Sequence, residues 1–152
     1  MADHLRTQIR DAALARVNSL STTGSRAFAG RPETRPLQPS ELPALLLHTT
    51  DTQSEDASGT RVTRRLIHEC DLIVSGYAKG TGDIDKTLDT IEKEVRVALE
   101  AAPTLGGLCK DLMCTAAVKD NEGDAEQPSW VIRMTWRCEY HTREGVPDAA
   151  LA

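Results

Sequence analysis

Two histidines and two cysteines form the most chemically suggestive group in the sequence. His68 and Cys70 stand two residues apart, and Cys138 and His141 lie close together further along the chain. Imidazole and thiolate groups are the usual ligands of structural zinc. In a β-strand, however, side chains alternate between the two faces, so Cys138 and His141 point to opposite sides. Closely spaced cysteine pairs are also missing, so we expect neither a metal site nor a cofactor.

A cysteine nucleophile is the second catalytic possibility. Such a residue needs a histidine partner and an exposed, electropositive setting that lowers its pKa. Cys109, which precedes Lys110, is the only candidate. Because no secretory signal is recognisable at the N-terminus, we expect reduced thiols packed in the interior instead. The four cysteines are Cys70, Cys109, Cys114 and Cys138.

Other catalytic motifs are lacking. Gly80-Thr81-Gly82 precedes a predicted helix, but it lacks the third glycine and the lysine of phosphate-binding loops. The sequence contains no Gly-x-Ser-x-Gly, no His-Glu-x-x-His and no carboxylate pair that stands out from ordinary surface charge. We therefore predict that the protein is not an enzyme and that it binds other molecules or builds structure.

Composition narrows the class of protein further. The chain has 152 residues, of which 39% are hydrophobic and 27% charged, as in ordinary globular domains. Its net charge of -5 repels phosphate, and its aromatic fraction of 3% leaves few rings on which bases could stack. No apolar run approaches the ~20 residues that span a bilayer. We therefore expect neither specific DNA binding nor a membrane segment.

Two amphipathic helices are predicted from the spacing of apolar residues. The first begins after Asp3, its expected N-cap, and carries apolar residues every three or four positions as far as Leu20. The second begins after Asp83, again the expected N-cap, and ends before Pro103. Its apolar face consists of Ile84, Leu88, Ile91, Val95 and Leu99.

Strands are predicted from alternating apolar residues. Short strands are expected at 25–29 and 44–49, and a long one runs from Val62 to the turn at Gly80. Leu112, Cys114, Ala116 and Val118 alternate as a further strand, and the last strand covers 130–140. Polar residues 50–60 are predicted to form a mobile loop, 31–42 an extended connection, and 119–128 an acidic hairpin connection.

These elements predict a single-domain α+β fold. A mixed or antiparallel sheet of about four to five strands would pack against the two main helices, which cover the apolar face of the last strand. We expect this domain to span residues 1–142. Residues 143–152 show no periodicity and are predicted to form an exposed C-terminal arm.

Clustered charges are the candidate interaction residues. One group is basic and lies at the start of the long strand: Arg61, Arg64 and Arg65. A second group is acidic and precedes it: Asp51, Glu55 and Asp56. A third is the acidic hairpin: Asp120, Glu122, Asp124 and Glu126. Solvated surface charge would explain all three, but complementary patches of this kind also favour association between copies of the chain.

Several short segments occur in a familiar order. They are Phe28-Ala29-Gly30-Arg31-Pro32, Leu42-Pro43-Ala44-Leu45-Leu46-Leu47, Ala102-Pro103-Thr104-Leu105-Gly106-Gly107-Leu108 and a strand ending in Tyr140-His141-Thr142. In this order the chain resembles the tail terminator proteins of long-tailed bacteriophages and is similar to minor tail protein U of lambda-like phages. The resemblance covers nearly the whole chain.

The resemblance implies a structural virion protein with no catalytic residue. Such a protein forms a homohexameric ring on the last ring of the tail tube protein, ends tube elongation and offers a docking face to a head-completion or connector protein. DNA passes through the ring without specific binding, and the protein is made in the bacterial cytoplasm and ends in the virion tail. A head-completion protein and a small cysteine- or metal-dependent enzyme remain the alternatives.

Overall fold

The computed structural model describes residues 2–30, 41–50, 52–57, 64–79, 82–121 and 129–151. The extended connection predicted at 31–42 therefore falls almost entirely outside the described residues. So do five of the candidate interaction residues. These are Asp51, Arg61, Glu122, Asp124 and Glu126.

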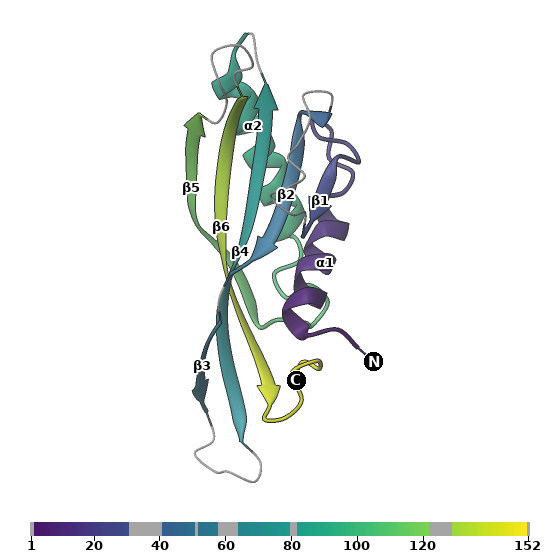
Figure 1. The fold of residues 1–152 in the computed structure, drawn as a ribbon, viewed down its shortest axis with the longest axis vertical. Helices are drawn as coiled ribbons and strands as arrows, with labels where there is room; N and C mark the ends of the chain where they lie inside the picture. Colours follow the sequence, from purple (N-terminus) through teal and green to yellow (C-terminus); the bar gives the residue numbers. More distant parts are fainter. Residues whose placement is uncertain are drawn as a thin grey trace.

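One mixed sheet of six strands forms the framework (Figure 1). The strands are β1 (Ala27–Ala29), β2 (Ala44–Thr49), β3 (Gln53–Asp56), β4 (Arg65–Lys79), β5 (Asp111–Asn121) and β6 (Ser129–Arg143). Their order is β1-β2-β4-β6-β5, with β3 pairing to β4 beyond the end of β2. Among the described strands, β1 and β2 are the only parallel pair. The predicted α+β class and single domain are confirmed, with one strand more than expected.

Two helices cover one face of the sheet. They are α1 (Leu5–Val17) and α2 (Ile84–Glu100). α2 packs against β4, β5 and β6, and α1 packs against β1, β2 and α2. Asp83 caps α2 as predicted, accepting a hydrogen bond from the Lys86 N–H, but the N-cap of α1 is His4 and not Asp3. Neither described helix is long and apolar enough to cross a bilayer.

The core lies between the helices and the even-numbered residues of β6. Ile132, Met134, Trp136, Cys138 and Tyr140 are all buried, as the alternation predicts. They meet the buried faces of both helices, which carry Leu5, Ile9, Ala13 and Val17 in α1 and Leu88, Ile91, Val95 and Leu99 in α2. β4 and β6 pair in register from Arg65 opposite Arg143 to Lys79 opposite Ser129.

β3 corrects the prediction of a mobile loop over residues 50–60. Its residues are polar and all exposed, so hydrophobic alternation gives no signal for a strand there. It forms because the backbone continues along the edge of β4 after β2 ends, placing Ser54 opposite His68 and Asp56 opposite Leu66. Hydrogen bonding to an existing strand, and not burial, determines this element.

β5 corrects a second prediction. A bulge at Thr115 shifts the register, so that Cys114 pairs with Trp136 whereas Ala116 pairs with Thr135. The residues after the bulge therefore change face. Val118, predicted to be inward, is 60% exposed. Lys119, predicted to lie in the connection, belongs to the strand and reaches Asp85 and Asp89 of α2 at 2.6 and 2.7 Å.

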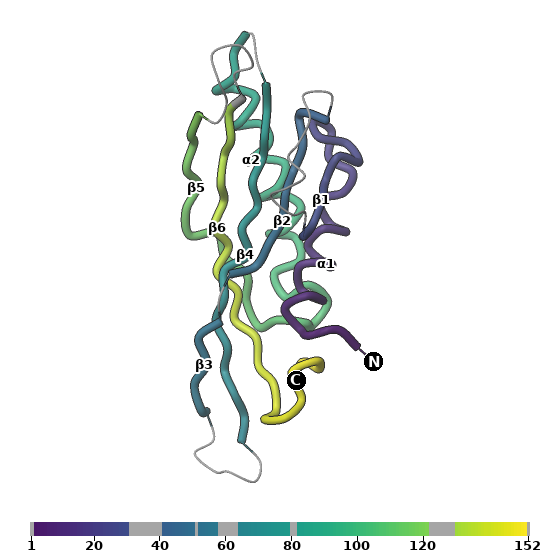
Figure 2. Tube along the Cα trace, in the orientation of Figure 1, coloured from purple at the N-terminus to yellow at the C-terminus, as the bar shows by residue number. Residues whose placement is uncertain are grey.

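The end of the sheet formed by β3 and the adjacent parts of β4 and β6 extends past the helices (Figure 1). Residues 144–151 fold back there, so that both chain termini lie on the same side of the molecule (Figure 2). The Leu5 N–H donates to the Pro147 carbonyl (2.9 Å), and the Leu151 N–H donates to that of His141 (2.8 Å). The division into a domain of 1–142 and an arm of 143–152 stays a prediction.

Candidate interaction surfaces

Arg64 and Arg65, the described residues of the basic cluster, contact side chains of the same chain. Arg64 Nε lies 3.2 Å from Asp56 Oδ2 and 3.6 Å from Glu144 Oε2, so these ion pairs join β3 and the C-terminal segment to the residue just before β4. Arg65 donates from Nη2 to His141 Nδ1 at 2.8 Å. Arg64 and Asp56, placed in separate candidate groups, thus meet each other. Their role in subunit contacts stays a prediction.

The remaining described acids are more open to solvent. Glu55 is exposed on β3. Asp120, near the end of β5, is exposed and lies 3.8 Å from Arg133 Nη1. Partially exposed ion pairs of this kind contribute little to folding stability. Both side chains thus lie where another molecule can reach them.

Three of the cysteines meet in the core. Cys70 faces Cys138 across β4 and β6, and both Cys70 and Cys109 hydrogen-bond to Cys138. These bonds and burial raise the pKa of Cys138. Cys70, Cys109 and Cys138 are buried, so Cys109 is not placed to attack a substrate. All four cysteines are free thiols, as predicted, although the fourth, Cys114, is only partly buried.

Among the described residues no group of histidines, cysteines or acids could hold a metal ion.

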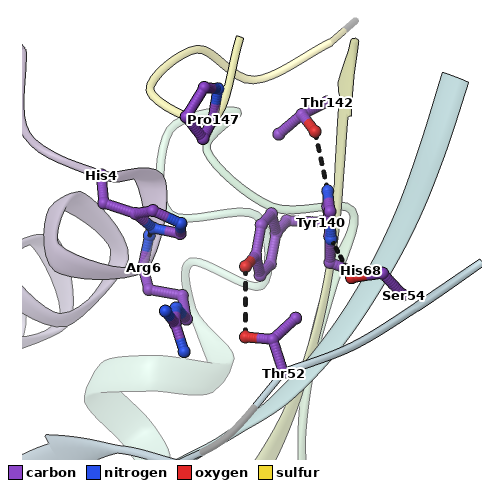
Figure 3. A pocket seen from close by; sticks show the side chains of 8 residues that line it. All are labelled: His4, Arg6, Thr52, Ser54, His68, Tyr140, Thr142 and Pro147. Atoms are coloured by element: carbon purple, nitrogen blue, oxygen red, sulfur yellow. Dashed lines mark hydrogen bonds between the residues drawn. The ribbon is translucent and has the colours of Figure 1, made fainter. Parts of the chain in front are cut away.

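A polar pocket of about 130 Å³ opens where the first turn of α1 meets β3, β4, β6 and the C-terminal segment (Figure 3). Its described lining residues are His4, Arg6, Thr52, Ser54, His68, Tyr140, Thr142 and Pro147. Apart from His68, sequence reasoning gave none of these residues a part in a binding or catalytic site. The pocket depends on β3, which the sequence did not reveal.

His68 forms the rigid wall of this pocket. Its Nδ1 lies 2.6 Å from Ser54 Oγ and its Nε2 lies 2.7 Å from Thr142 Oγ1, so both ring nitrogens have hydroxyl partners. The ring stacks on Tyr140 with centroids 4.7 Å apart. The Tyr140 hydroxyl is 3.4 Å from Thr52 Oγ1. Each strand around the pocket therefore contributes a fixed polar group.

Positive charge surrounds His68. Burial is the largest cause that lowers its pKa, followed by His4, His141 and Arg6. Arg6 comes from α1 and keeps donors available, since its one described hydrogen bond is a long one of 3.4 Å from Nη1 to the Thr50 carbonyl. The pocket thus favours the neutral form of His68 and the binding of an anion.

This environment predicts acid-sensitive stability. Because the pKa of His68 is lower in the folded state than its ordinary value of 6.5, the unfolded chain binds the proton more readily. Stability should therefore fall as pH drops below about 6.5, through the folded pKa. We expect urea unfolding midpoints to fall between pH 7.5 and pH 5.5, and to fall less in His68→Gln. Equal pH dependence in both proteins would contradict the assignment.

Comparisons with known proteins point to one family. The family model described as Phage minor tail protein U matches residues 4–140. A solved chain described as part of the "Virion of native gene transfer agent (GTA) particle" shares 18% identity and a TM-score of 0.50, over 91% of this chain and 92% of that one. This likeness concerns the fold. No curated protein sequence matches significantly.

Proposed function

Because the chain belongs to the Phage minor tail protein U family, and is thus a structural component of a phage-type tail and not an enzyme, we propose that it is the tail terminator. In this role several copies, six by analogy with lambda-like phages, form a ring on the last ring of tail tube protein. The ring ends tube elongation and presents a face to the head-completion protein. The observation that carries the proposal is the family match over residues 4–140.

The shape of the subunit supports ring formation. The end of the sheet built by β3, β4 and β6 extends past the helices and offers an edge to a neighbour (Figure 1). β3 is an exposed strand with one described partner, β4, and such edges are templates for contact with another chain. Glu55, exposed on this strand, opposes uncontrolled pairing and favours a partner of complementary charge, whereas Asp56 is paired with Arg64 of the same chain.

The acidic residues have a proposed place in the ring. Each copy adds a net charge of -5 to the assembly. Acidic groups along the channel would repel DNA phosphates within a Debye length of about 8 Å, so DNA would pass without binding. We assign this role to Asp120, near the end of β5, and to the acidic residues that follow it in the sequence, Glu122, Asp124 and Glu126.

Negative-stain microscopy of the purified protein with headless tail tubes tests the proposal. We expect a ring at one end of each tube and tubes that no longer elongate when tube protein is added. A variant with lysine at Asp120, Glu122, Asp124 and Glu126 serves as a comparison. It should keep the wild-type melting temperature, because the described acid Asp120 is exposed, but should impair assembly or DNA passage.

Three outcomes are informative. Tubes that continue to elongate in the presence of the protein would contradict the terminator role. Binding to the head-side connector without any binding to tubes would favour the alternative, a head-completion protein. Normal assembly and DNA passage by the lysine variant would overturn the channel role of these four acidic residues and leave the ring proposal unaffected.

A further inference from the structure

The polar pocket holds one permanent cation, Arg6, and no acid among its described lining residues. Arg6 lines it from α1, His4 from the N-cap position of that helix and His68 from β4. The whole chain has 23 acidic residues against 18 basic ones. Within the described ranges no carboxylate lies within ion-pairing distance of Arg6. The positive charge therefore has no described counterpart at the site.

The position of Arg6 is electrostatically unfavourable in the isolated subunit. It lies in the first turn of α1, at the positive end of the helix dipole, where acidic residues are stabilising and cations are not. That turn carries no acid at all. A sequence that breaks a local rule in this way without compensation within the chain usually does so at a functional site.

The available donors are side chains and not the end of the helix. The Leu5 N–H donates to Pro147, and the Arg6 N–H donates to His4 Nδ1 at 3.1 Å, so these backbone groups are already used. Since His4 Nδ1 accepts, the proton of the neutral ring lies on Nε2. Figure 3 shows the His4 ring and the Arg6 side chain on one side of the pocket and Tyr140 on the other.

We propose that this pocket binds a carboxylate group, held by the Arg6 guanidinium and the His4 Nε2–H. A guanidinium presents two parallel N–H donors that match the two oxygens of a carboxylate. A cavity of about 130 Å³ accommodates an acetate or the end of an acidic side chain. The Tyr140 hydroxyl, only weakly paired with Thr52 at 3.4 Å, is positioned as a further donor.

Titration with sodium acetate at constant ionic strength, balanced with chloride, tests the site directly. We expect saturable NMR shifts of the His4 and His68 ring signals and an upward shift of the His68 pKa. Arg6→Gln should weaken acetate binding by about tenfold or more, because a charge-assisted hydrogen bond is lost. Arg6→Lys should retain part of the affinity. Arg16→Gln, in the last turn of the same helix, removes an equal charge away from the pocket and should bind like wild type.

A second arm identifies the source of the carboxylate and rests on the proposed ring. If an acidic side chain of a second copy fills the pocket, Arg6→Gln will block ring formation, Arg16→Gln will not, and acetate will inhibit the wild-type ring. If a free carboxylate fills it, acetate will bind while both variants form rings. Absence of saturable acetate shifts at His4 and His68 overturns the proposal, whatever the assembly result. The acetate titration uses the unassembled protein, so its failure can be told apart from a failure to form rings.

Discussion

Trp136→Ala is expected to cost about 3 to 5 kcal/mol of folding free energy. Trp136 is completely buried in the middle of β6, between Leu72 of β4 and Cys114 of β5. Removing the indole leaves a cavity that neighbouring strands, fixed by their hydrogen bonds, cannot close. The melting temperature should fall by roughly 6 to 20 °C for a chain of this size. Calorimetry of the wild-type protein and the Trp136→Ala variant measures this difference in melting temperature.

Trp136→Phe is the matched control. The indole Nε1 is buried, and no described residue accepts a hydrogen bond from it. Replacement by phenylalanine removes this unsatisfied donor as well as part of the ring, so the two effects partly cancel. We expect Trp136→Phe to reduce the folding free energy clearly less than Trp136→Ala does. An unchanged melting temperature in Trp136→Ala would show that the inward face of β6 is wrongly assigned.

Gly76→Ala should destabilise the protein by about 1 to 3 kcal/mol through overpacking. Gly76 is buried in β4, where α2 approaches the sheet closely. A Cβ atom built at this position would lie 2.6 Å from Ile91 Cγ2 and 3.3 Å from Ile132 Cγ2. Because Ile91 belongs to the rigid helix, the contact must be relieved by a shift of α2. Urea unfolding of the variant measures the loss.

Ile91→Leu provides the test of this mechanism. Leucine lacks the Cγ2 methyl group that the new Cβ would meet, so it removes the closest contact while conserving volume. The double variant Gly76→Ala/Ile91→Leu should therefore be more stable than the sum of the single effects predicts. Strict additivity would mean that the Ile91 contact is not the source of the strain.

The sequence predicts the main elements because their burial leaves a periodic signal. Both helices, β2 and the inward face of β6 agree closely with the expected spacing of apolar residues. β3 could not be found in this way, since its residues are exposed and its pairing with β4 follows from the path of the backbone. The bulge at Thr115 also lacks a signal, because alanine and threonine fit either face of a strand.

The candidate site was harder to predict than the fold. Clustered charge suggested interaction residues, yet the structure pairs Arg64 with Asp56 within one chain. The pocket unites residues from the beginning, middle and end of the sequence, such as Arg6, His68 and Tyr140, and only the tertiary fold brings them together. One usable signal was present: a helix whose first turn has an arginine and no acid.

The bulge in β5 also determines how this strand tolerates change during evolution. Before Thr115 the even-numbered residues face the helices, and after it the odd-numbered ones do, which brings Lys119 over Asp85 and Asp89. A substitution alters one side chain, but deletion of Thr115 would invert the face of every residue from Ala116 to Asn121. Val118 would then turn inward and Lys119 outward. An insertion or deletion at this point therefore changes more of the surface than the exposure of the strand suggests.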